Sequence, residues 1–483
     1  MRAADELNRR PASELARLIR DKAASPLEVL QAHLEAIERL NPKVNAICTL
    51  AAESAIAAAK RAENAVMAGD PLGPLHGLPV GIKDVTPTAG IRTTFGSPLY
   101  ADYVPTEDAE VVALLKEAGA IILAKTNTPE FAAGANTVNE VFGATRNPWN
   151  IALSVGGSTG GGAAALACGM IALAEGTDFG GSLRVPAAFC GVVGLRPTAG
   201  LVPRFPVPMP WDVGNVQGPM ARTVDDTALM LDAMAGDGRF SPISVPKPWK
   251  NIAALLAEPR DLSDLRIGYA PDIAGVGVDQ AIAKPCRTAA IRLADHGATI
   301  EELDFSLADG RAAYLTLRGL TMVGRFIDQL DKIDSFGANL KGNIEAGLKL
   351  KITDVAAAER KRGELWNRCR VLFDRIDLLL TPTTPVPPFP VEQNYPTSIA
   401  GQKLVTYIDW IAQTFLVTLC GLPALSVPCG CTANGLPVGL QIIGPRFAEP
   451  KILRTAKLLE QMNPIGWPPI VTASVRDQRA RSL

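Results

Sequence analysis

The sequence predicts an α/β protein, in which short buried strands alternate with amphipathic helices. Short apolar runs bounded by turn residues recur along the chain, helical patterns separate them, and the alternation continues almost from end to end without an internal repeat. With 483 residues and 47% hydrophobic content, the chain can bury a large core. We therefore expect a single domain over residues 1–483, although length alone would allow two or three.

Residues 1–70 are predicted to be helical. Ser25 to Glu28 form a capping box with proline at the first helical position, and apolar residues then follow at helical spacing until Asn41-Pro42, where we expect the helix to end. An alanine-rich segment, residues 51–68, predicts a second amphipathic helix. These helices have no feature beyond packing.

Residues 71–235 contain the first strands and the most unusual motifs. An apolar strand is predicted at residues 78–82, with Lys83 at its end, and a helix near 108–118 leads to a strand at 120–124. Ligands bind beyond the carboxyl ends of strands in open α/β sheets, so Lys83 is placed as a catalytic cation would be. An isolated lysine more often merely flanks a strand, and only the residues that contact Lys83 can distinguish this from a catalytic role.

The alternation continues to the C-terminus. Residues 306–375 are mainly helical and more charged, which predicts a helical layer near the active site. The other expected elements are helices at 221–236, 279–296, 406–419 and 450–461, and strands at 265–269, 298–304, 378–380, 425–429 and 438–443.

Charge and cysteine content exclude several classes of function. The net charge of −1 gives no electrostatic reason to expect nucleic acid or an anionic membrane, and no run is apolar enough to span a bilayer. The eight cysteines have no metal-ligand spacing and are interpreted as reduced core residues. We expect a cytoplasmic protein, because the first residues lack the apolar stretch of a secretory signal.

Two glycine-rich turns, residues 156–162 and 176–182, each carry one serine, Ser158 and Ser182. A phosphate-binding loop is disfavoured because no Gly-Lys-Ser/Thr follows either turn. A Ser-His-Asp triad would need one of only three histidines, and no G-x-S-x-G elbow is present. A neutral lysine can serve as the base instead, provided that its pKa falls from about 10.4 to roughly 7 or 8.

The two turns resemble the signature of the amidase signature hydrolases. The resemblance lies in residues 156–164 and 176–198, with the same spacing of the two serines. It spans most of the chain, because it continues through residues 75–84, 142–149, 218–224, 380–383 and 421–429. It implies a large mixed β-sheet covered by helices on both faces.

The resemblance also implies a catalytic triad of Ser182 as nucleophile, Ser158 as proton relay and Lys83 as base, with a cis peptide bond before Ser158. The backbone amides of Phe179, Gly180, Gly181 and Ser182 would form the oxyanion hole. Asp178, Arg184 and Thr159 are expected to support the site. No metal or cofactor is required by this chemistry.

Three positions depart from the usual family pattern without removing a triad residue. Thr159 stands where a second serine is common, Gly162 where serine is frequent, and Phe179 where threonine is usual. Phe179 places an additional aromatic ring beside the expected oxyanion hole.

The expected reaction is hydrolysis of a small aryl or alkyl amide or anilide, or of an ester or carbamate, through an acyl-enzyme. The expected partner is a small-molecule amide, with no nucleic acid and no membrane, and the chain would be a monomer or homodimer. The A-type component of a tRNA-dependent amidotransferase is the rival within the family, and a non-catalytic binding protein is the alternative outside catalysis. Candidate pocket residues are Phe131, Asn136, Phe205, Met209, Trp211 and Trp410.

Overall fold

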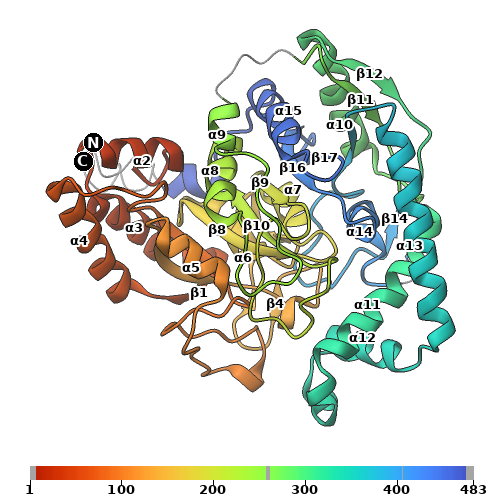
Figure 1. Cartoon of the computed structure of the whole chain (residues 1–483), viewed down its shortest axis with the longest axis horizontal. Helices are drawn as coiled ribbons and strands as arrows, with labels where there is room; N and C mark the ends of the chain where they lie inside the picture. Colours follow the sequence, from red (N-terminus) through yellow and green to blue (C-terminus); the bar gives the residue numbers. More distant parts are fainter. Residues whose placement is uncertain (1–6, 257–261, 405, 475–483) are drawn as a thin grey trace.

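The computed structural model describes residues 7–256, 262–404 and 406–474, and its centre is one mixed sheet of eleven strands (Figure 1). Parallel pairs occur at β2 with β3 and β8, and at β11 with β12 and β13, while the other neighbours are antiparallel. In spatial order the strands are β1 (Ile47–Leu50), β3 (Ile121–Thr126), β2 (Pro79–Lys83), β8 (Leu173–Asp178), β10 (Val216–Ala221), β9 (Val193–Arg196), β16 (Ala424–Cys431), β17 (Pro437–Ile443), β13 (Leu378–Pro382), β11 (Arg266–Tyr269) and β12 (Thr299–Glu302).

Helices pack against both faces of this sheet. The helices are α2 (Ala12–Arg20), α3 (Pro26–Val44), α4 (Ala52–Ala68), α5 (Glu110–Glu117), α6 (Gly160–Ala167), α7 (Arg184–Cys190), α8 (Val224–Met234), α9 (Ile252–Leu255), α10 (Gln280–Arg292), α11 (Arg311–Arg325), α12 (Ala338–Leu348), α13 (Ile352–Phe373), α14 (Ala412–Leu419) and α15 (Glu449–Met462). Successive residues of a strand point to opposite faces of its sheet. In β8, Leu173 packs in the hydrophobic core that contains α8 and α15, and the next residue, Ala174, packs in the core that contains α6. The predicted sheet covered on both faces is therefore confirmed.

The N-terminal helices follow the sequence signals with one difference. Ser25 and Glu28 form the predicted capping box at the start of α3, but the helix continues past Pro42 to Val44. Pro42 has no backbone N–H to donate to the preceding turn, but it lies two residues before the end of α3, so the helix loses little by it. Asn45, in the left-handed conformation, then ends the helix and donates its amide to Asn41 O.

Two helices begin inside or beside the glycine-rich turns and were not predicted. α6 follows Thr159 with three consecutive glycines, and α7 begins two residues after Ser182. Three glycines at the start of α6 and a proline within the short α7 weaken the helical signal of the alanines beside them. Their helical form comes from burial, because every residue of α6 and α7 is buried. Another difference is small: the helix expected from residue 406 begins at Ala412.

The pairing of β2 with β8 brings the two key motifs together. These strands are parallel neighbours, with Ile82 opposite Glu175, so that Lys83 and Asp178 both end their strands at the same edge of the sheet. Polar groups at the carboxyl ends of neighbouring parallel strands share one site. The first serine turn lies between β7 (Asn150–Ser154) and α6, and the second between β8 and α7.

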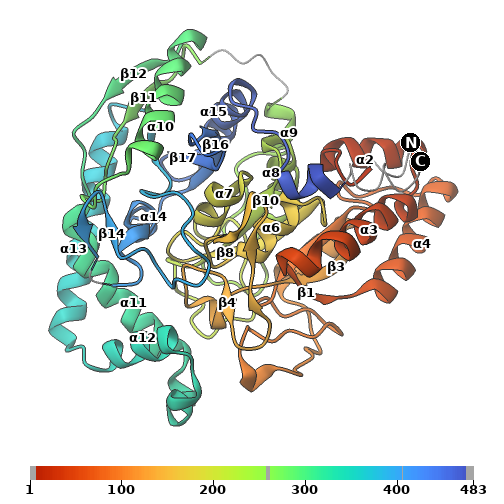
Figure 2. The ribbon, with the colours of Figure 1, turned by 180° about the vertical axis from the view of Figure 1, so that it is seen from behind.

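The helices α11, α12 and α13 form a group on the side of the sheet near β11 and β12, and Figure 2 shows the same arrangement from behind. The C-terminal end of α11 reaches the cavity that contains both serines.

Among the described residues, no helix combines the length and the apolar character needed to cross a bilayer. All eight cysteines are free; six are buried, Cys48 is half-buried and Cys431 is exposed, which corrects the expectation that all belong to the core.

Candidate active site

Lys83 is completely buried at the end of β2, and its amine faces two hydroxyl groups. Nζ lies 2.6 Å from Ser158 Oγ and donates to Thr177 Oγ1 at 2.9 Å. Burial lowers the pKa of Lys83 to about 7, because desolvation disfavours the charged amine, whereas Glu175 acts in the opposite direction. A substantial fraction of the amine is therefore neutral at neutral pH, as a general base must be.

Ser158 lies in the first glycine-rich turn, and its peptide bond with Gly157 is cis. The amide of Thr159 donates to Ser182 O at 3.1 Å, so that the two turns are joined directly. Ser158 and Ser182 both line the same cavity. Lys83, Ser158 and Ser182 are thus brought to one site from three separate segments of the chain.

Asp178 holds the second turn in place. Its carboxylate accepts the amides of Gly181 and Leu183, on either side of Ser182, at 3.0 and 3.2 Å. Arg184 donates to both of its oxygens, through Nε at 3.0 Å and Nη2 at 2.8 Å. Burial by itself would raise the pKa of Asp178, but the guanidinium groups of Arg184 and Arg196 outweigh this effect and lower the pKa to about 2. The turn is therefore fixed by a charged network that excludes water.

Three amides of this turn are open to a ligand. Within the described part of the chain, the amides of Phe179, Gly180 and Ser182 have no acceptor, whereas the Gly181 amide is used by Asp178. Adjacent amides without acceptors, beside a serine hydroxyl, are the arrangement that can bind a developing oxyanion. Of the four amides predicted as donors, three remain free for that role.

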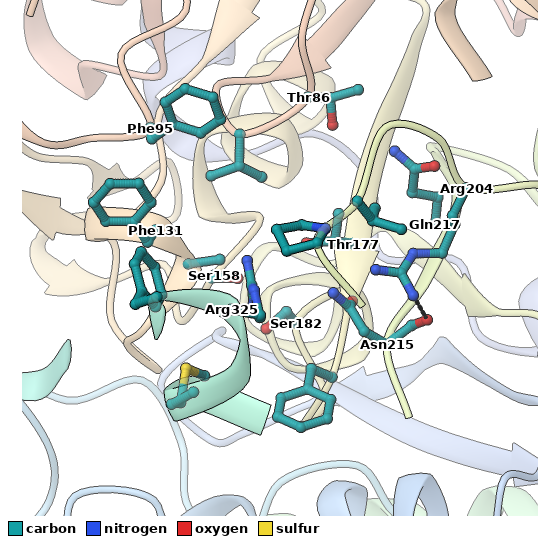
Figure 3. Close-up of a pocket in the computed structure, with 18 of the residues that line it drawn as sticks. Thr86, Phe95, Phe131, Ser158, Thr177, Ser182, Arg204, Asn215, Gln217 and Arg325 are labelled. Carbon is teal, nitrogen blue, oxygen red and sulfur yellow. Dashed lines mark hydrogen bonds between the residues drawn. The ribbon is translucent and has the colours of Figure 1, made fainter. Parts of the chain in front are cut away.

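A cavity of about 460 Å³ opens above the two serines, a size suited to a small organic molecule. Phe95 and Phe131 lie on one side of the serines in Figure 3, and their rings stack with centroids 5.7 Å apart. Polar side chains lie on the other side: Arg204, Asn215 and Gln217. The cavity therefore has an aromatic wall and a polar wall, with the serines between them.

Comparison with known proteins assigns the family. The family model described as Amidase matches residues 28–453. The chain belongs to the amidase family. It is accordingly an enzyme that hydrolyses amides, and the resemblance found in the sequence is confirmed.

Similar proteins include two kinds of family member. An acylamidase from Rhodococcus erythropolis is 35% identical over 462 residues, covering 94% of this chain and 95% of that protein. The A-type component of the glutamyl-tRNA(Gln) amidotransferase from Geobacillus kaustophilus (strain HTA426) is 36% identical over 477 residues, covering 93% and 96%. The crystal structure of a bacterial aryl acylamidase of the amidase signature family superposes with a TM-score of 0.88 at 28% identity, covering 94% and 96%.

Only two of the six predicted pocket residues of this amidase line the cavity, Phe131 and Phe205. Trp410 is completely buried in the core, where it stacks on Phe189 at 5.6 Å. Asn136 is also buried away from the cavity, and its amide donates to two backbone carbonyls.

The remaining two predicted residues follow Phe205 in a proline-rich loop. Met209 and Trp211 do not line the cavity, and Trp211 is 73% exposed. Met209 lies beside Gly324, where an added Cβ would come within 2.6 Å of its sulfur. Residues 205–208 of this loop line the cavity, and the loop leaves it at Met209.

Sequence reasoning missed several residues of the site. Thr177 is the second partner of the Lys83 amine, and its position one residue before Asp178 was the only available signal. Arg204 and Arg325 line the cavity but lie in segments without a motif. Within residues 7–256, 262–404 and 406–474, no cluster of three or more His, Cys, Asp or Glu side chains is placed to hold a metal ion.

Proposed function

We propose that this amidase cleaves the C–N bond of small amides through an acyl-enzyme on Ser182. The observation that carries the proposal is the buried Lys83 amine, 2.6 Å from Ser158 Oγ, with a pKa of about 7. A neutral amine in contact with a buried serine that lines a cavity is a proton acceptor, because burial disfavours its protonated form.

The reaction follows from these positions. Neutral Lys83 takes the proton of Ser158, which takes the proton of Ser182, and the Ser182 oxygen forms a bond to the substrate carbonyl carbon. The open amides of Phe179, Gly180 and Ser182 support the negative charge on the carbonyl oxygen. The C–N bond breaks as the proton returns through Ser158 to the leaving nitrogen. Water then attacks the acyl-enzyme by the reverse proton path and releases the acid.

The substrate class of the proposal is an aryl or alkyl amide or anilide, with esters and carbamates as further members. Its support is the aromatic wall of Phe95 and Phe131, together with the similarity to an acylamidase and to an aryl acylamidase. The proposal includes a cytoplasmic chain that acts alone or as a homodimer, without nucleic acid. Eight free cysteines support that location.

The main alternative is a component of a tRNA-dependent amidotransferase, because relatives of that name match the chain equally well in sequence. The two functions differ in what the isolated chain does. We expect the purified chain alone to release aniline from simple anilides, and adding misacylated tRNA with glutamine to produce no amidated tRNA. Aniline release only in the presence of partner proteins would favour the alternative.

The catalytic residues are tested by covalent labelling. A sulfonyl fluoride should modify Ser182, as read by mass spectrometry of the peptide, and the labelling rate should fall by about 10²- to 10⁴-fold in Lys83→Ala. The matched control is Lys284→Ala, an exposed lysine on α10, which should label at the wild-type rate. Modification of another residue, or equal labelling in Lys83→Ala, would contradict the proposed triad and favour a non-catalytic role.

A further inference from the structure

The residues that line the cavity carry more positive than negative charge, and the nearest counter-charge of two of the arginines, Asp212, is not among them. The lining includes three arginines, Arg204, Arg318 and Arg325, and no aspartate or glutamate. Within the described chain, none of these arginines forms an ion pair within 4.0 Å, and the Asp212 carboxylate attracts Arg204 and Arg325 only from a longer distance. Buried charges are ordinarily paired, because taking an ion out of water is costly. A wall of this kind is suited to a ligand that brings the missing negative charge.

Arg325, which is half-buried, is the arginine of this wall without any hydrogen-bond partner among the described residues. It is the last residue of α11, and its guanidinium lies over the Phe326 ring at 5.9 Å. Arg184, by contrast, donates to Asp178, Thr414, Thr418 and Gln441. An arginine at the C-terminal end of a helix often does no more than interact favourably with the helix dipole. Arg325 instead faces the space between the two walls, near Ser158 and Ser182 (Figure 3).

The other two arginines are held by neutral groups. Arg204 donates Nη1 to the carbonyls of Asp212 and Asn215, and Arg318 donates to Asn343 and to Tyr407. These acceptors orient a guanidinium without cancelling its charge, and arginine stays protonated at neutral pH. Of the two, Arg204 lies on the polar wall, opposite the aromatic wall (Figure 3).

The amides of the polar wall are also available to a ligand. The side chains of Asn215 and Gln217 form no hydrogen bond to the described residues, although both are nearly buried. Buried polar groups are nearly always satisfied, so unpaired amides beside unpaired guanidinium groups indicate a place for oxygen atoms of a substrate. Carboxylate is the group of choice, because the planar guanidinium matches its two oxygens.

We propose that the substrate is an amide that also carries a carboxylate, held by Arg325 and the polar wall, while an aryl or alkyl group lies against Phe95 and Phe131. This inference rests on the proposed hydrolysis at Ser182 and specifies its substrate class. Monoamides of dicarboxylic acids and acylated amino acids have this combination. The neutral anilides named above are then substrates that use the aromatic wall alone.

The experiment uses pairs of probes that differ only in charge. The monoanilide of succinic acid is compared with the isosteric carboxamide, N-phenylsuccinamide, and 4-acetamidobenzoate is compared with 4-acetamidobenzamide. Aniline or aminobenzoyl release is measured for each. For at least one pair, we expect kcat/KM for the acid to exceed that for the amide by on the order of 10- to 100-fold, the range of a hydrogen bond to a charged group.

The variants show whether Arg325 causes the preference. Arg325→Met should abolish it, Arg325→Lys should restore part of it, and Arg287→Gln, an exposed arginine on α10, should leave it unchanged. A ratio between two probes on one variant is used because loss of Arg325 also changes Lys83, and that effect is common to both probes. Equal rates for acid and carboxamide in both pairs, or a preference that survives in Arg325→Met, would overturn the inference.

Binding to Ser182→Ala separates this inference from the proposed reaction. Calorimetry with the same pairs measures recognition without turnover. Tighter binding of the acid that depends on Arg325, without hydrolysis by the wild-type protein, would support the carboxylate site and contradict the proposed function. Hydrolysis of neutral anilides together with equal, or equally undetectable, binding of acid and carboxamide would support the function and contradict the carboxylate site.

Discussion

The amine of Lys83 lies 2.6 Å from Ser158 Oγ, and its other hydrogen-bond partner among the described residues is the neutral hydroxyl of Thr177. A carboxylate in either place would hold the amine in its charged form. Two hydroxyl groups in a buried site stabilise the charge much less, and desolvation therefore determines the pKa of about 7. This relationship connects the position of Lys83 at the end of β2 to its use as a base.

The pH dependence of hydrolysis follows from this pKa. Because the neutral amine is the active form, kcat/KM should be constant above about pH 7 and fall about tenfold per unit below it. Stopped-flow or initial-rate measurements with an uncharged anilide between pH 5 and 9 test this, since such a probe does not titrate. A profile that is flat down to pH 5 would contradict a lysine base.

Two charged neighbours should move that profile in opposite directions. Glu175 raises the pKa of Lys83 and Arg325 lowers it. Glu175→Gln should therefore shift the acid limb to lower pH and Arg325→Met should shift it to higher pH, each by on the order of one unit. Arg287→Gln is exposed and distant in the fold, and should not shift it. If Glu175→Gln and Arg325→Met shift the acidic side of the kcat/KM profile in the same direction, the shift reflects a general loss of structure and not the pKa of Lys83.

The sequence predicted the parts of this protein whose signals are local. The capping box at Ser25, the strand ending at Lys83 and the two serine turns depend on adjacent residues, and the structure has each of them. The helices α6 and α7 could not be predicted in the same way. They are stabilised by complete burial between the sheet and neighbouring segments, which no local propensity reports.

The substrate cavity was the least predictable feature, because its lining comes from segments that are far apart in the chain. Aromatic residues in a core and in a pocket look alike in sequence, so Trp410 was chosen although it packs on Phe189, and Phe95 was overlooked. Arg325 ends a helix, where a basic residue has an ordinary role. Only the tertiary structure shows that its guanidinium enters the cavity.

The buried network of Asp178 and Arg184 should be essential to folding as well as to activity. Arg184→Met leaves the Asp178 carboxylate buried with less compensation and should lower the free energy of unfolding by about 3–5 kcal/mol, measured by urea denaturation. Asp178→Asn keeps the shape but leaves the buried Arg184 and Arg196 without a carboxylate, so it should cost a similar amount of stability and slow the labelling of Ser182. Wild-type stability in Arg184→Met would contradict this role.

The same network gives a prediction for acid stability. The folded pKa of Asp178, about 2, lies below the ordinary value of about 3.9, so its stabilising contribution is complete above that ordinary value and is lost as the pH falls toward 2. The free energy of unfolding of the wild type should therefore fall between pH 4 and 2 more steeply than that of Asp178→Asn. Parallel pH curves for the two proteins would show that this carboxylate is not responsible.

Gly181 tests the geometry of the nucleophile turn, because no other residue fits its position. Its φ of +120° is one that residues with a side chain rarely adopt, and an added Cβ would lie 2.2 Å from Thr414 Oγ1. Gly181→Ala should therefore displace the open amides of Gly180 and Ser182, which flank residue 181, and lower the labelling rate by about 10²- to 10³-fold, the effect of losing an oxyanion donor. The control is Gly69→Ala at the end of α4, where φ is also positive but the space is open. It should cost about 1 kcal/mol of stability and leave labelling unchanged. Equal labelling by the two variants would contradict a role of the Gly180 and Ser182 amides in the reaction.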